Sequence, residues 1–147
     1  MQPQALTPVD AALAQILADV TPVEGTESVP LAQLRGRVLA ADAISAIDVP
    51  PADNSSMDGY ALRHADLGAG QREFAISQRI AAGAVGTMLV PSTAARIFTG
   101  AEVPPGADCV VIQENCRVAD GVVTVLQAAV PGENIRRRGQ DIAAGSA

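Results

Sequence analysis

The residues best placed to do chemistry lie in the stretch PPADNSSMDGYALR, residues 50–63, and centre on Asp58. Gly59 permits a positive φ, so Asp58 can sit on a sharp turn with its carboxylate projecting from the chain. Ser56 and Tyr60 place further donors and acceptors close by, more than a two-residue turn needs. This grouping indicates a site for a polar ligand; the alternative is an ordinary turn in which Asp58 accepts hydrogen bonds from its own backbone.

A second candidate is Thr99-Gly100, which follows a predicted strand in the stretch RIFTGAEVPPGAD, residues 96–108. A hydroxyl beside a glycine at a strand end can offer its oxygen and free backbone N–H groups to an anion. The alternative is a strand end closed by the threonine side chain bonding to nearby backbone.

A third candidate is the arginine triplet in NIRRRGQDI, residues 134–142. Guanidinium groups match the oxygens of phosphate and other oxyanions, often through two parallel hydrogen bonds. In an extended chain, side chains alternate between faces, so Arg136 and Arg138 would share one face. The alternative is a solvated basic loop, an intersubunit salt bridge, or pairing of one arginine with Asp141.

The composition excludes several classes of function. The net charge is −6 and all ten basic residues are arginine, so a P-loop lysine and Schiff-base chemistry are excluded. An acidic chain is a poor binder of nucleic acid, because neutralising phosphates supplies most of that affinity. Cys109, Cys116 and His64 are too few for a zinc site built on cysteine and histidine, and Cys109 in its apolar run is interpreted as a buried thiol.

The chain shows no sign of a membrane or secretory segment. Met1–Leu6 lacks both a basic segment and an apolar core, so no signal peptide is predicted. No apolar run reaches the roughly 18 residues that a membrane-spanning helix needs. We therefore predict a cytoplasmic location with no membrane partner.

Hydrophobic periodicity predicts helices first and strands afterwards. The first helix covers residues 7–20, with Thr7 as its N-cap and Pro8 at the first helical position, and the second covers residues 30–41. Residues 119–121, Ala-Asp-Gly, predict a hairpin turn. Extended segments or strands are expected at residues 42–49, 60–63, 72–80, 95–100, 109–118 and 122–130. The fold class is α+β and mostly β.

Three stretches, in this order, resemble the N-terminal half of the molybdopterin molybdenumtransferases, the MoeA/gephyrin E-domain family. They are DVPPADNSSMDGYALR, AGAVGTMLVPSTAARIFTGAEVPPGADCVVIQE and GENIRRRGQDIAAG, and the similarity covers about residues 7–147. One departure is visible, since Pro91-Ser92-Thr93 stands where the family usually has a Pro-Gly turn.

The resemblance implies a domain layout and a function. Residues 1–45 would be the helical part of domain I, 46–130 a β-rich inserted domain II of twisted, bifurcated sheets, and 131–147 a return segment to domain I. The helices and the tail would form an elongated linker and dimerisation part. The family inserts molybdate into adenylylated molybdopterin with loss of AMP, and a third, larger domain holds most of the pterin-nucleotide site. The chain alone would then be inactive.

The resemblance also assigns residues and partners. Asp58 and Thr99 are the candidate catalytic residues, and Asp58 is also the candidate ligand for Mg²⁺. The expected substrate-binding residues are Ser56, Gly59, Tyr60, Gly100, Arg136, Arg138 and Asp141. The substrates would be molybdate and adenylylated molybdopterin, and the partners a second copy of the chain and the upstream adenylylating enzyme.

Two sets of alternatives stand beside these assignments. Asp58 could hold a divalent ion between phosphates, orient a water, or act as a general acid or base. The chain could also be a non-catalytic dimerisation or protein-interaction module of the gephyrin type, rather than part of an enzyme.

Overall fold

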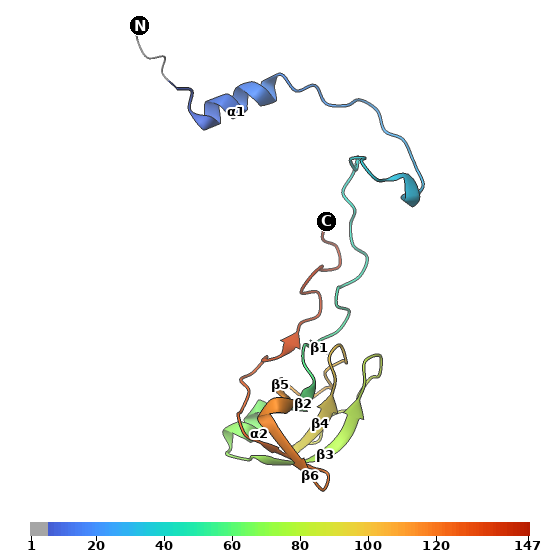
Figure 1. Ribbon diagram of the computed structural model, residues 1–147. Helices are drawn as coiled ribbons and strands as arrows, with labels where there is room; N and C mark the ends of the chain where they lie inside the picture. Colours follow the sequence, from blue (N-terminus) through green and yellow to red (C-terminus); the bar gives the residue numbers. More distant parts are fainter. Residues whose placement is uncertain (1–5) are drawn as a thin grey trace. The chain divides into compact units, whose positions relative to one another are not determined.

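The computed structural model describes residues 6–147, which divide into a first unit ending at Ala41 and a second unit, Asp42–Ala147 (Figure 1). Contacts therefore place the tail, residues 131–147, in the second unit, while the expected domain boundaries at 45 and 130 stay predictions. The opening segment, for which no signal peptide is predicted, lies outside the described residues except for Leu6. Within residues 6–147, no helix has the length and apolar character needed to cross a bilayer.

The first unit contains helix α1, Val9–Ala18, which confirms the helix predicted over residues 7–20. The predicted cap is wrong. The N-cap is Pro8, with no side-chain hydrogen bond, and its carbonyl accepts the first helical hydrogen bond from the Ala12 N–H at 3.0 Å. Thr7 is thus one residue too early to cap the helix, because the proline takes the half-in position itself.

The second predicted helix, residues 30–41, is wrong. Only a single 3₁₀ turn, η1 (Leu31–Gln33), forms there. Gly36 adopts a φ of +82°, which a right-handed helix cannot include. The apolar residues of the pattern also have nothing to pack on, since Val38 is 95% exposed. A short helix gains most of its stability from packing its apolar face, so the pattern alone does not sustain one.

The second unit is built on a six-stranded sheet that curls in Figure 1, which confirms the mostly-β prediction. The strand order is β5-β2-β4-β3-β7-β6, and only the β3–β4 pair is parallel. The strands are β2 (Gly59–Leu62), β3 (Glu73–Ile80), β4 (Thr93–Ile97), β5 (Cys109–Ile112), β6 (Cys116–Ala119) and β7 (Val122–Val125).

Three of the strand predictions need correction. The single strand expected over residues 109–118 is two strands, because a 3₁₀ turn, η2 (Gln113–Asn115), redirects the chain to the far edge of the sheet. The strand expected over residues 122–130 ends at Val125. The segment 42–49, expected to be extended, joins no sheet within residues 6–147 and makes one bridge there, from Val49 to Ile142. The turn at residues 119–121 is confirmed as a hairpin joining β6 to β7, with positive φ at both Asp120 and Gly121.

The sequence did not predict two short elements of the second unit. A small second sheet pairs β1 (Asn54–Ser55) with β8 (Ile135–Arg136), in antiparallel register. Helix α2, His64–Gly68, follows β2 directly. Segments of two to five residues carry too little periodicity to be recognised as strands or helices.

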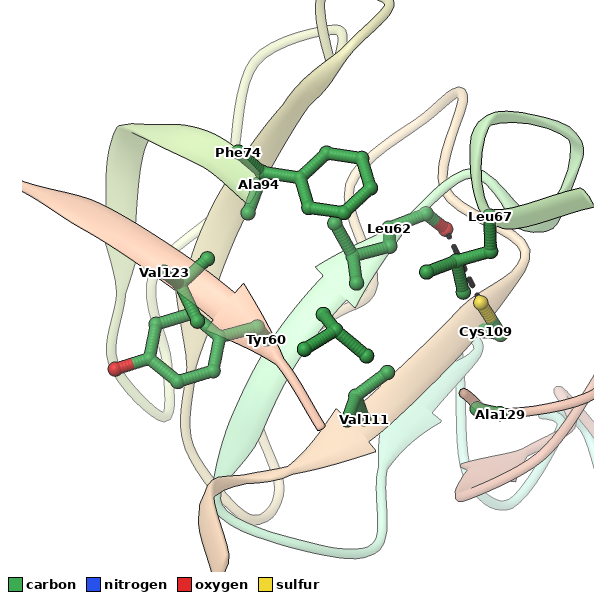
Figure 2. Packing of buried hydrophobic residues seen from close by; sticks show 10 residues of the cluster. Tyr60, Leu62, Leu67, Phe74, Ala94, Cys109, Val111, Val123 and Ala129 are labelled. Atoms are coloured by element: carbon green, nitrogen blue, oxygen red, sulfur yellow. Dashed lines mark hydrogen bonds between the residues drawn. The ribbon is translucent and has the colours of Figure 1, made fainter. Parts of the chain in front are cut away.

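The sheet of the second unit is covered on both faces. One cluster of buried side chains includes Tyr60, Leu62, Phe74 and Val123, and Figure 2 shows these side chains converging. A second cluster on the opposite face includes Ala61. Because β2 alternates between the two clusters, all four of its residues are buried.

Cys109 belongs to the first of these clusters. Its thiol is buried and lies 3.6 Å from the Leu62 carbonyl oxygen (Figure 2). Burial, with some help from the charge of Asp108, raises the pKa of this thiol to about 12. The prediction of a buried cysteine is confirmed, and a raised pKa makes a thiol a poorer nucleophile.

Ser92 marks the departure from the family pattern and gives a first prediction. Its φ is +62°, a conformation in which an L side chain is strained and glycine is not. Its N–H donates to Asp66 Oδ2 at 2.9 Å, a bond that glycine would keep. Ser92→Gly should therefore raise the free energy of unfolding by about 0.5–1 kcal/mol in urea titrations. A lower stability would show that the serine side chain makes a compensating contact.

Candidate functional site

The sheet brings Asp58 and Thr99 together. Asp58 lies just before β2 and Thr99 just after β4, and these strands are antiparallel, with Gly59 opposite Ile97. Asp58 Oδ1 accepts hydrogen bonds from the Thr99 backbone N–H and the Thr99 hydroxyl, both at 2.8 Å. The carboxylate is thus bonded to the second motif, 41 residues along the chain, and not to its own turn.

The environment of Asp58 keeps its carboxylate ionised. The backbone N–H of Thr99, then its hydroxyl, lower the pKa of Asp58; desolvation opposes them, and the charge of Arg96 lowers the pKa by a smaller amount. Oδ2 accepts no hydrogen bond from any described residue. An ionised carboxylate with one free oxygen suits a base, a metal ligand or a water-orienting group better than a general acid.

Strand β1 joins all three candidate motifs through backbone hydrogen bonds. The Ser55 N–H donates to the Ala101 carbonyl at 2.9 Å, and the Gly100 N–H donates to the Ser55 carbonyl at 2.8 Å. On the other side, the Ser56 N–H donates to the Asn134 carbonyl at 3.0 Å. The stretches that the sequence singled out are therefore neighbours in space.

These same bonds correct one expectation. The backbone N–H groups of Thr99 and Gly100 were expected to be free for an anion, but both are bonded within the chain. An anion at this strand end would have to displace a native hydrogen bond of the backbone. Gly100 keeps a conformational role, because its φ is +80°.

A small hollow of about 180 Å³ lies beside β1. Asp58, Thr99 and the arginine triplet are not among its lining residues, so it does not unite the predicted site. Of the candidates, only Gly100 borders it, and Glu102 contributes its one carboxylate. The lining residues are Pro51, Ala52, Asn54, Gly83, Ala84, Val85, Gly100 and Glu102.

Each arginine of the triplet is paired with an acid of the same chain. Arg137 Nη1 lies 2.6 Å from Asp53 Oδ2, and Arg138 Nε lies 2.5 Å from Asp48 Oδ2. Arg136 pairs with Asp141, so this alternative interpretation of Asp141 is confirmed. The role of Arg136, Arg138 and Asp141 in substrate binding stays a prediction, and it would require these pairs to open.

The ion pairs of Arg137 and Arg138 connect the C-terminal segment, residues 131–147, to the residues that precede β1. The Asp53 carboxylate also accepts the Arg138 N–H, and Asp48 also accepts the Ala144 N–H, both at 2.8 Å. For Asp53, partial burial raises the pKa, but the bonds from Arg138 and Arg137 outweigh it and the net pKa is lowered. For Asp48, the bond from Ala144 and then that from Arg138 lower the pKa.

This connection predicts acid sensitivity. Because the folded-state pKa values of Asp48 and Asp53 lie below their unfolded values, their contribution is present above about pH 4 and is lost as pH falls through the folded values. We would measure the free energy of unfolding of the second unit in urea at pH values from 6 to 2. It should fall more steeply with falling pH for the wild type than for Asp53→Asn. Equal slopes would mean that this pair does not contribute to stability.

Three further candidates are held in the fold by packing or by backbone contacts. Gly59 is buried, and an added Cβ would lie 2.1 Å from the Val111 carbonyl oxygen. Tyr60 is 6% exposed and belongs to the core, which leaves little of it for a substrate. Ser56 is half-buried and joins the motifs through its N–H alone. The fold thus explains the residue types of Gly59 and Tyr60, whereas the backbone contact of Ser56 requires no particular side chain. A substrate-binding role for all three stays a prediction.

Arg96 is a residue that the sequence reasoning missed. Its guanidinium donates to the Gly59 carbonyl at 3.2 Å and to Gln113 Oε1 at 2.7 Å, and it lies 4.6 Å from the centre of the Phe98 ring. It therefore contacts the residue after Asp58 and the residue before Thr99. The signal was an arginine within the apolar strand sequence TAARI.

The chain is similar to known proteins in its sequence. A family model described as the MoeA N-terminal region (domain I and II) matches residues 7–147. The chain is 40% identical over 124 residues to molybdopterin molybdenumtransferase 2 of Mycobacterium tuberculosis (strain ATCC 25618 / H37Rv), covering 81% of this chain and 31% of that protein. It is 36% identical over 138 residues to molybdopterin molybdenumtransferase of Haemophilus influenzae, covering 93% of this chain and 34% of that protein.

A solved structure shares the fold. The crystal structure of the molybdopterin biosynthesis moeA protein from Pyrococcus horikoshii OT3 matches with a TM-score of 0.78 and 34% identity, over 97% of this chain and 39% of that one. The chain belongs to the MoeA N-terminal region family. It spans about a third of the length of the curated relatives it matches.

Proposed function

We propose that the chain is the domain I and II part of an enzyme that inserts molybdate into adenylylated molybdopterin with release of AMP. Relatives at 34–40% identity carry the name molybdopterin molybdenumtransferase. The observation that carries the proposal is the Asp58–Thr99 pair, since two separate motifs meet to hold one ionised carboxylate. The remainder of such an enzyme would supply most of the substrate contacts, so the chain alone should be inactive.

Asp58 would be the chain's main contribution to the chemistry. With Oδ1 occupied by Thr99, Oδ2 would accept a proton, orient a water or bind a cation as oxo groups leave molybdate. Thr99 would act by fixing the carboxylate and keeping it charged.

The residues partly fit the Mg²⁺ that the family implies. No cluster of three or more His, Cys, Asp or Glu groups that could hold a metal occurs among residues 6–147. Mg²⁺ is commonly bound by one or two carboxylates together with substrate phosphates, so a single oxygen from Asp58 is sufficient for a shared site. When bound, the ion would neutralise charge on the phosphates, while Asp58 itself only orients it.

The proposal is tested in a chimera. Residues 7–147 would replace the matching N-terminal region of the full-length relative from Mycobacterium tuberculosis, and AMP release and molybdenum incorporation would be measured. We expect activity within about tenfold of the parent. A folded chimera without any activity would contradict the proposal, because the region would then lack the groups the reaction needs.

One observation favours a second, interaction role. The apolar stripe of α1 is exposed, with Val9, Leu13, Ile16 and Leu17 all more than half exposed. We propose that a second copy of the chain covers it, giving the homodimer expected from the family. Sedimentation would test this. A dimer that Leu13→Glu dissociates is expected, and a monomer at all concentrations would contradict it.

The upstream adenylylating enzyme as partner and the cytoplasmic location stay proposals.

A further inference from the structure

We propose that Arg79 and Arg96, held against the Phe98 ring, form a binding site for a phosphoanion at the end of the sheet next to Asp58. The Arg79 guanidinium carbon lies 4.4 Å from the centre of this ring and that of Arg96 lies 4.6 Å from it. Two cations thus share one aromatic side chain. Phe98 directly precedes Thr99, so the site adjoins the Asp58–Thr99 pair.

The sheet itself holds the two arginines side by side. Arg79 on β3 is the register partner of Arg96 on β4. The Arg96 guanidinium carbon also lies 5.1 Å from the centre of the Tyr60 ring, and the guanidinium donates hydrogen bonds to Gly59 and Gln113. These contacts hold the Arg96 side chain in place. A guanidinium restrained in this way loses little entropy when it binds an anion.

Within the described part of the chain, Arg79 and Arg96 form no salt bridge with a carboxylate, unlike the three arginines of the triplet. Among residues 6–147, no carboxylate oxygen lies within 4.0 Å of either guanidinium, whereas all three triplet arginines have such a partner. Like charges on directly neighbouring strand positions destabilise a sheet. The arrangement is therefore one that a bound anion would stabilise, and it arises in a chain whose net charge of −6 otherwise repels anions.

A phosphoryl group is the ligand that this arrangement fits. Its oxygens can accept from two guanidinium groups at once, and the two phosphoryl groups of a pyrophosphate linkage together carry more charge than one carboxylate. That the ligand is the phosphate of adenylylated molybdopterin rests on the proposed function; the anion site itself does not. Arg79 and Arg96 would bind the phosphate while Asp58 remains available to a cation or a water.

The test measures binding of inorganic pyrophosphate to the chain by calorimetry and by NMR shifts of the Arg Nε–H groups. Saturable binding centred on Arg79 and Arg96 is expected. Arg79→Gln and Arg96→Gln should each weaken it about tenfold, and Arg96→Lys should weaken it less. Arg117→Gln removes an exposed arginine of β6 and is the matched control, with binding unchanged. Succinate should bind more weakly than pyrophosphate.

The outcomes separate this site from the proposed function. Asp58→Asn should leave pyrophosphate binding intact or stronger, since it removes a nearby negative charge, even though it should lower the proposed activity strongly. Loss of affinity in Arg117→Gln equal to that in Arg79→Gln, or no saturable binding, would overturn the site. An active chimera that is insensitive to Asp58→Asn but still binds pyrophosphate would overturn only the role of Asp58.

Discussion

Replacing Gly59 with alanine is expected to unfold the second unit. The new Cβ would lie 2.1 Å from the Val111 carbonyl oxygen, and real Cβ atoms essentially never approach another atom so closely. The neighbouring atom is backbone of β5, and β2 is held between β5 and β4, so neither strand can move without breaking register. We expect a loss of about 3 kcal/mol or more in urea unfolding followed by circular dichroism.

Gly100→Ala is the matched control for this change. Gly100 has a φ of +80°, but an added Cβ would meet no atom within 4 Å. The cost should be about 1–2 kcal/mol, from the left-handed conformation alone. If Gly59→Ala proved as mild as Gly100→Ala, the close approach of β2 and β5 would be wrong, and Gly59 would again be a candidate for contact with substrate.

Replacing Asp58 with asparagine should remove activity while the fold stays intact. The asparagine Oδ1 can still accept from the Thr99 N–H and hydroxyl, but the negative charge is lost. In the chimera, we expect molybdenum incorporation to fall roughly 10²-fold or more, the range typical of a lost acid–base group. Thermal unfolding of the chain itself should shift little, and this separates loss of chemistry from loss of structure.

Thr99→Ser is the conservative control for that experiment. Serine keeps both the N–H and the hydroxyl that bond to Asp58, so activity should stay within a few-fold of the unaltered chimera. Full activity of Asp58→Asn with normal folding would instead show that the carboxylate has only a structural role, linking the ends of β2 and β4.

The sequence predicted the β-rich part well because its signals are local. Alternation and apolar runs identified β2, β3, β4 and β7, and Asp120-Gly121 identified the hairpin. Helix α1 followed from its periodicity in the same way. The helix predicted over residues 30–41 does not form, because a short amphipathic helix needs a surface to pack on. Within residues 6–41, Leu31 and Val38 remain exposed.

The candidate site was predictable in its centre and not in its surroundings. Two motifs rich in glycine and polar residues indicated Asp58 and Thr99, but only the antiparallel pairing of β2 with β4 shows that they bond to each other. The arginine triplet was the strongest charge signal in the sequence. Its neutralisation by Asp48 and Asp53, more than 80 residues earlier, depends on long-range contacts that no local pattern reports. An arginine within the apolar strand TAARI marked Arg96, but its pairing with Arg79 depends on the register of β3 and β4, which no local pattern reports.

The most direct test of the central claim is a double-mutant cycle on Asp58 and Thr99 in the chimera. We propose that the two residues act as one unit, with Thr99 acting through the carboxylate. Molybdenum incorporation would be measured for Asp58→Asn, Thr99→Val and the double variant. We predict that Thr99→Val lowers activity when Asp58 is present and adds little once Asp58 is replaced. Two losses that multiply, as for independent residues, would contradict the account.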